Sequence, residues 1–147
     1  MKNIQIAIGC DHAGFKCKEE IIARYSDCNF IDCGTFSEES VDYPDFGHKV
    51  GNLINDKKRK NCKQGIVICG SGIGISIAAN KVKGVRAALC NTVEHAKLSR
   101  LHNDANVLGL GSRLTNKKDI FQIIDTFLST EFEGGRHKNR RDKIDLK

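Results

Sequence analysis

Apolar residues along the chain follow two alternating patterns. Short runs rich in Ile, Val and Ala, typical of buried parallel strands, recur between segments whose apolar residues are three or four apart, as in helices that bury one face. The runs predict five strands, over residues 4–9, 29–33, 64–69, 85–90 and 107–111. The spaced segments predict helices over residues 15–25, 44–55 and 92–102, one that ends at Ala79, and a last one that carries Ile120, Ile123, Ile124, Phe127 and Leu128.

Strands that alternate with helices form a parallel sheet with right-handed crossovers. The prediction is therefore an α/β fold, a Rossmann-like three-layer α/β/α sandwich around a five-stranded parallel sheet, in a single domain over residues 1–147. After Glu133 the pattern breaks at Gly134-Gly135, and a basic tail follows over residues 134–147. Because this helical tail has little apolar surface of its own, we expect it to dock on a second copy of the chain.

The most informative segment is the third strand with the turn after it, where Cys-Gly-Ser-Gly-Ile-Gly occupies residues 69–74. A strand that ends in a glycine-rich turn and opens a helix presents backbone N–H groups to an anion. The dinucleotide fingerprint fails because Ile75 stands where its last glycine is required, and no Gly-Lys-Ser/Thr of a phosphate loop follows. A small-anion site beside the Cys69 thiol fits better, and a tight turn without a ligand is the alternative.

Other candidate residues follow strands or end helices. Asp11 and His12 follow the first strand, so a parallel sheet places them at the same edge as Cys69, although Asp11 also suits a helix N-cap. His102 ends the fourth helix, where it is either a partner for the helix dipole or a proton donor near neutral pH. Arg113 follows the fifth strand and is a candidate for phosphate binding.

The formal net charge of +6 comes largely from two basic clusters, over residues 57–63 and 136–141. Aromatic residues make up only 6% of the chain and do not interleave with these charges, which argues against nucleic-acid binding. The first cluster is predicted to be a solvated loop. In the second, Arg136 and Arg140 are four apart, so a helix would place both on one face as a phosphate clamp. A solvated basic end is the alternative.

The chain has seven cysteines, an odd number, and no two of them have Cys-x-x-Cys spacing. This pattern favours neither a disulfide framework nor a zinc site. We expect most of them to be small buried residues in a reducing compartment, and no metal is called for. No apolar run approaches the roughly 20 residues of a membrane span. A strand-like segment begins at Ile4, where a signal peptide would lie. The expectation is a cytoplasmic protein without a membrane partner.

Taken together, the motifs resemble those of one family, in its order and spacing. They are Gly-Cys-Asp-His-Ala-Gly at 9–14, Asp-Tyr-Pro at 42–44, the segment 69–81, Ser-Arg-Leu-His-Asn-Asp at 99–104, 106–108 with 111–113, and Glu-Gly-Gly-Arg-His at 133–137. Over nearly its whole length the chain resembles B-type ribose-5-phosphate isomerases, in the family that also holds galactose-6-phosphate isomerase subunits. The resemblance implies a cofactor-free interconversion of D-ribose 5-phosphate and D-ribulose 5-phosphate through an enediolate, in the pentose phosphate pathway.

The resemblance also implies a role for each matching residue. Cys69 is the base that moves the proton between C1 and C2, and the Ser71 hydroxyl relays protons between the enediolate oxygens. Asp11 and His102 assist opening of the sugar ring, with His102 as the proton donor. Residues implied to contact the sugar and its enediolate are Tyr43, Gly70, Gly72, Ile73, Gly74 and Asn103. Those implied to hold the phosphate are His12, Arg113, Arg136 and Arg140.

Family members are homodimers, or dimers of dimers, whose sites are built from both subunits, which agrees with the solitary basic tail. One branch uses a glutamate base at the position of Ile75, so the mechanism here depends on Cys69. Ser71 stands where relatives have threonine and keeps the hydroxyl. A six-carbon sugar phosphate, such as allose or galactose 6-phosphate, remains an alternative substrate. A nonenzymatic nucleotide- or nucleic-acid-binding module is a rival of another class.

Overall fold

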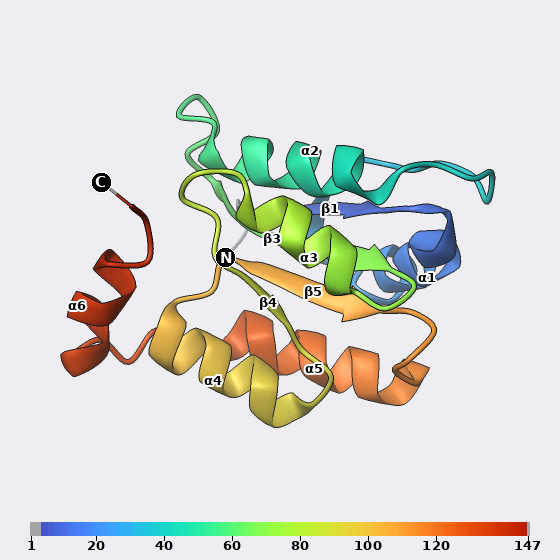
Figure 1. The fold of residues 1–147 in the computed structure, drawn as a ribbon. Coiled ribbons are helices and arrows are strands. Elements are labelled where there is room, and N and C mark those ends of the chain that lie inside the picture. Colours follow the sequence, from blue (N-terminus) through green and yellow to red (C-terminus); the bar gives the residue numbers. More distant parts are fainter. Residues whose placement is uncertain (1–3, 147) are drawn as a thin grey trace.

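Five parallel strands form one sheet in the order β2-β1-β3-β5-β4 (Figure 1). In this computed structural model, which describes residues 4–146, they are β1 (Gln5–Cys10), β2 (Asn29–Asp32), β3 (Cys62–Cys69), β4 (Ala87–Leu89) and β5 (Val107–Gly111). The central strand β3 pairs with β1 and β5, so that Val67 aligns with Gly9 on one side and Gly109 on the other. The predicted α/β fold with a five-stranded parallel sheet is confirmed.

Helices cover both faces of the sheet (Figure 1). One face carries α1 (Phe15–Arg24), α4 (Val93–Asn103) and α5 (Lys117–Ser129), and the other carries α2 (Tyr43–Asn55) and α3 (Ile73–Asn80). Alternation along β1 divides the core accordingly: Ile6 and Ile8 pack with the first set of helices, and Ala7 packs with the second. Within the described residues, no helix is both long and apolar enough to cross a membrane.

Local sequence signals mark the residues at which helices begin. Pro44 lies in the first turn of α2, where a missing N–H leaves no hydrogen bond unmade. At the start of α4 the Thr92 hydroxyl accepts a hydrogen bond of 3.1 Å from the His95 N–H, as an N-cap does. The predicted strand over residues 85–90 is shortened to β4, because the Arg86 N–H donates to the Asn106 side chain at 2.7 Å and so does not pair with a strand.

The strands all run the same way, so the sheet has a carboxyl edge, where β1, β3 and β5 end, and an amino edge, where they begin. A short 3-10 turn, η1 (His12–Gly14), and the start of α3 lie at the carboxyl edge. Helix α4 runs back against the strands and ends just before β5, at the amino edge. The tail forms α6 (Arg136–Asp142), which packs beside α4 of its own chain, far from the start of α3 (Figure 1).

Candidate active site

The Cys69 thiol closes the glycine turn at the carboxyl edge. Cys69 is the last residue of β3 and only 4% exposed, and its Sγ accepts a hydrogen bond of 3.2 Å from the backbone N–H of Gly72. Helix α3 begins at the next residue, Ile73. An N–H donor at a helix N-terminus stabilises the anionic form of a thiol. Cys69 therefore combines the two properties of a base, a polar partner for its charged form and a position at a strand end.

The other six cysteines have a different environment. Burial raises the pKa of the Cys10 thiol to about 12 and the pKa of the Cys17, Cys33 and Cys90 thiols to about 11. Desolvation also raises the pKa of Cys28 and Cys62. All seven cysteines are free, and those six stay protonated at neutral pH. Three of the six are half-buried and three fully buried, so the expectation of small buried residues holds in part.

The turn itself needs glycine at two places. Gly72 has φ 77°, and an added Cβ would lie 2.7 Å from the Leu110 carbonyl carbon, so a larger residue would have to push β5 aside. At Gly74 an added Cβ would lie 2.6 Å from the ring of Tyr43, the first residue of α2. The ring of Tyr43 thus rests on the first turn of α3. This contact brings a predicted sugar-binding residue to the glycine turn.

Asp11 and His12 lie at the end of β1, beside β3. The Asp11 N–H donates to the Ile68 carbonyl at 3.2 Å, one residue before Cys69. Asp11 is 6% exposed, and its side chain accepts a hydrogen bond from the Gly14 N–H, so its N-cap role is confirmed. The Nδ1 atom of His12 accepts a hydrogen bond of 3.2 Å from the Val41 N–H. This contact leaves Nε2 of His12 as the nitrogen that can donate to a ligand.

Arg113 completes the group at the carboxyl edge. Its backbone N–H donates to the Gly70 carbonyl at 2.9 Å, and its side chain passes the face of Gly70, where an added Cβ would lie 3.4 Å from Cδ and Nη1. The neighbouring Ser112 hydroxyl bonds the Ala13 carbonyl at 2.8 Å and so links this loop to η1. The guanidinium of Arg113 is thus held beside the N–H groups of the glycine turn. A cation and aligned N–H donors suit an anionic ligand.

Four predicted site residues lie elsewhere in the chain. His102 and Asn103 end α4, at the amino edge, and Arg136 and Arg140 lie on α6 beside it. The structure does not bring these four to Cys69. The reason is topological: a crossover helix runs antiparallel to the strands, so its last residues reach the edge opposite the strand ends. The predicted site residues therefore form two groups, one at each edge of the sheet.

At the amino edge, His102 stacks on His137, which lies in the Glu-Gly-Gly-Arg-His motif and for which no role was predicted. The ring centroids are 4.2 Å apart and the rings are inclined by 14°. Burial lowers the pKa of His137, and the neighbouring His102 and Arg136 lower it further. The Glu133 carboxylate lies beside both rings. Its Oε2 atom is 3.7 Å from Nε2 of His102 and 3.6 Å from Nε2 of His137. Glu133 lies outside α6, so the rule for residues four apart on one helix did not apply, and no sequence signal indicated this contact.

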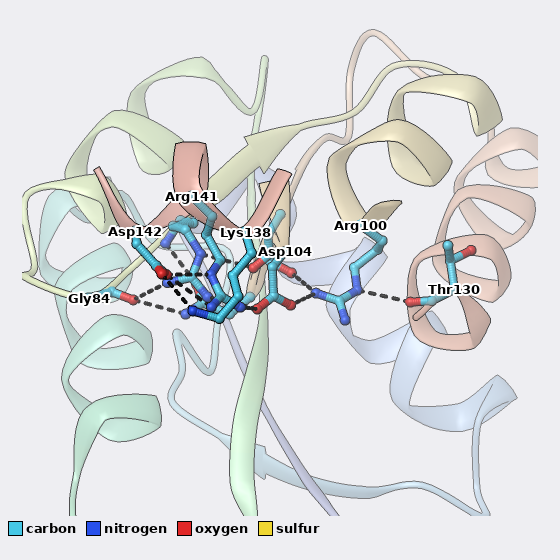
Figure 2. A network of polar contacts seen from close by, with 10 residues as sticks. Gly84, Arg100, Asp104, Thr130, Lys138, Arg141 and Asp142 are labelled. Atoms are coloured by element: carbon cyan, nitrogen blue, oxygen red, sulfur yellow. Dashed lines mark hydrogen bonds and ion pairs between the residues drawn. The ribbon is translucent and has the colours of Figure 1, made fainter. Parts of the chain in front are cut away.

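Helix α6 is held in place by Asp104, for which no role was predicted either (Figure 2). Asp104 follows α4 with φ 47° and accepts hydrogen bonds from Arg100 at 2.9 Å and from Arg141 of α6 at 2.7 Å. Arg86, which precedes β4, donates to the backbone carbonyl of Asp104 at 2.9 Å, and its Nη2 atom lies 3.5 Å from the Asp104 carboxylate. One carboxylate thus joins the end of α4, the entry to β4 and the basic tail. Asp104 therefore sets where Arg136 and Arg140 lie relative to His102.

We expect Asp104→Asn to lower the free energy of unfolding by about 2 kcal/mol, the scale of lost hydrogen bonds to charged groups. Asparagine keeps the size of the side chain and tolerates a left-handed backbone, so the substitution removes mainly the charge. Urea denaturation measures the change. The matched control is Asp142→Asn, because Asp142 also pairs with Arg141 but is exposed, and it should leave the midpoint almost unchanged. Equal midpoints for the two variants would contradict the role of Asp104.

Comparison with known proteins gives consistent matches. A sequence model of the family described as Ribose/Galactose Isomerase matches residues 6–144. The chain is 44% identical to ribose-5-phosphate isomerase B of Escherichia coli over 95% of this chain and 93% of that protein. A Thermotoga maritima ribose 5-phosphate isomerase structure superposes with a TM-score of 0.91 at 48% identity, covering 97% of each chain. The Mycoplasma genitalium ribose-5-phosphate isomerase B, solved with bound ribulose-5-phosphate, gives a TM-score of 0.89 at 41% identity, over 98% of this chain and 95% of the other.

Proposed function

The chain belongs to the ribose/galactose isomerase family, and from this we infer that it interconverts D-ribose 5-phosphate and D-ribulose 5-phosphate. Relatives with this activity in their names align with nearly the whole chain, and one of them holds ribulose-5-phosphate. One observation in this chain carries the inference. The Cys69 thiol lies at the start of the glycine turn and accepts a hydrogen bond from the Gly72 N–H. Aldose–ketose isomerisation needs a base and donors for an oxyanion, and this turn offers both.

We propose that Cys69 is the base. In the open-chain sugar the thiolate removes the proton from C2, an enediolate forms, and the proton returns to C1. Of the backbone N–H groups of residues 70–74, that of Gly72 donates to Cys69 and that of Ile73 to Ser71. The others then face the negative oxygens, where each well-placed donor typically contributes about 3 kcal/mol. The Ser71 hydroxyl oxygen accepts the Ile73 N–H at 3.2 Å, which leaves its own hydrogen free to pass between the two sugar oxygens. This arrangement supports a proton relay by Ser71.

Asp11, His12, Tyr43 and Arg113 surround this turn in the same chain, and we propose that they bind the sugar phosphate there. The Tyr43 ring forms a wall beside Gly74. The free Nε2 of His12 and the guanidinium of Arg113 suit the phosphate, which supplies binding energy remote from the reacting carbons. Asp11, nearly buried beside Cys69, suits a hydroxyl group of the sugar.

The remaining groups are supplied by a second copy of the chain in our proposal. His102 would protonate the ring oxygen during ring opening, Asn103 would contact the sugar, and Arg136 with Arg140 would complete the phosphate site. Support comes from the division of the site residues between opposite edges of the sheet, because one chain cannot bring them together. A symmetric dimer that sets the amino edge of each chain against the carboxyl edge of the other makes two complete sites.

The substrate assignment is tested by kinetics on sugar phosphates of two lengths. We expect kcat/KM for D-ribose 5-phosphate to exceed that for allose 6-phosphate and galactose 6-phosphate by about tenfold or more, the discrimination that one extra carbon unit typically gives in a fitted pocket. Product formation is followed for each substrate with the same enzyme preparation. A higher kcat/KM on a six-carbon substrate would contradict the assignment and show that the chain acts on six-carbon sugar phosphates.

A further inference from the structure

A cluster of three potential metal ligands lies at the amino edge, apart from the thiol. His102, Glu133 and His137 each offer one ligand atom, and these atoms lie within 4.8 Å of one another. The Glu133 Oε2 atom is 3.7 Å from Nε2 of His102 and 3.6 Å from Nε2 of His137. Two imidazoles and one carboxylate form a known donor set for zinc sites that keep a fourth position open.

The distances are close to those of a bound ion. Metal–ligand bonds of about 2.1 Å at tetrahedral angles place ligand atoms about 3.4 Å apart. Each carboxylate–imidazole distance exceeds this by only a few tenths of an ångström. The two rings are stacked and nearly parallel, so at least one of them must tilt substantially out of the stack before both lone pairs converge on one point. The side chains of His102 and Glu133 are 38% and 56% exposed, which leaves them room for this adjustment.

The backbone around the cluster is already fixed. The Glu133 N–H donates to the Leu101 carbonyl at 3.1 Å, which ties Glu133 to the turn of α4 that holds His102. The His137 N–H donates to the Gly134 carbonyl at 3.1 Å, and the His137 side chain is 9% exposed. Little chain entropy is therefore lost when an ion binds. Arg136 and Arg140 lie on the same short helix, and their charges oppose a cation, so the affinity will be weaker than that of a structural zinc site.

We propose that His102, Glu133 and His137 bind a divalent transition-metal ion such as Zn²⁺, and that the bound ion inhibits the enzyme. The ion binds the imidazole of His102, the side chain that would carry the proton in ring opening. No step of isomerisation uses this ion. The inhibition rests on the proposed function of His102, whereas the binding does not.

Binding is tested on the full-length, chelator-treated protein with Co²⁺ as a spectroscopic probe and Zn²⁺ in calorimetry. A Cys69→Ser background removes the thiol most able to compete. We expect visible Co²⁺ bands without a sulfur-to-cobalt charge-transfer band. Glu133→Gln should weaken binding by about tenfold or more, because a lost ligand costs at least as much as a lost supporting contact. The control is Glu131→Gln, an exposed carboxylate two residues away, which should leave the affinity unchanged.

Inhibition is measured in proteins that keep Cys69. For each protein, we determine the Zn²⁺ concentration that halves the rate of D-ribose 5-phosphate isomerisation, relative to the rate of the same protein without metal. Glu133→Gln should raise this concentration about tenfold, and Glu131→Gln should not. Because Glu133 is exposed, its substitution keeps the fold even if changes at His137 disturb α6. Equal Zn²⁺ affinity in wild type and Glu133→Gln, or a Co²⁺ spectrum of thiolate ligation alone, would overturn the proposal. Metal binding in a protein without isomerase activity would count only against the proposed function.

Discussion

Cys69→Ala is expected to abolish isomerisation while the fold survives. A positioned general base typically contributes about 10²–10⁴-fold to a proton-transfer step, and here the same residue also anchors the glycine turn through the Gly72 N–H. We expect kcat to fall by at least about 10³-fold. Removing one buried sulfur should cost about 1 kcal/mol of stability, so circular dichroism and the melting temperature should remain near those of wild type.

Two further variants separate the chemistry from the packing. Cys69→Ser keeps the size and the acceptor for the Gly72 N–H but offers a hydroxyl that is not ionised at neutral pH, so its loss of kcat should be nearly as large. Cys17→Ala removes a half-buried thiol of α1 and should leave kcat unchanged. A Cys69→Ala protein that turns over within tenfold of wild type would show that another group is the base.

Mixing Cys69→Ala subunits with Arg136→Ala subunits is expected to restore activity that neither parent has. If each site takes Cys69 from one chain and Arg136 from the other, a mixed dimer has one intact site and one doubly defective site. With random exchange about half of the dimers are mixed, so the mixture should reach about one quarter of the wild-type activity. The parents should be far less active, since Arg136→Ala would remove the charge-assisted phosphate contact that we propose for Arg136.

The experiment requires exchange of subunits by mild denaturation and refolding, followed by assay at a substrate concentration well below the wild-type KM, where the loss of a phosphate contact lowers the rate. The matched control mixes Cys69→Ala with Cys69→Ser, which lack the same group and should give no recovery. An activity equal to the average of the two parents would mean that each site lies within one chain. That result would contradict the shared site and leave the role of Cys69 intact.

The elements that the sequence predicted well are those with strong local patterns. The apolar run before Cys69 and the helix start at Pro44 needed only periodicity and capping rules. The short strand β4 was predicted too long, because Arg86 bonds to the Asn106 side chain, a partner that no local pattern indicates. The α/β architecture followed from the order of the elements, which does not depend on their exact ends.

The residues of the site were predicted, together with a site shared between two copies of the chain, but the edge of the sheet at which each residue lies was not. The chain places His102 and Cys69 at opposite edges of the sheet. This separation could have been inferred, since a helix that leads directly into a strand ends at the amino edge. The contacts of Asp104 with Arg141 and of His102 with His137 could not, because they join segments more than thirty residues apart through side chains alone.

The seating of α6 on α4 within its own chain bears on how two copies would meet. The Arg141–Asp104 contact and the His102–His137 stack already order this helix before any association. In the dimer that we propose, a partner would encounter a preformed surface, because the ordering entropy that a loose arm would lose on docking is already lost during folding. We therefore expect the proposed assembly to resemble the meeting of two rigid bodies, with a rate limited by collision and orientation and no folding step to precede it.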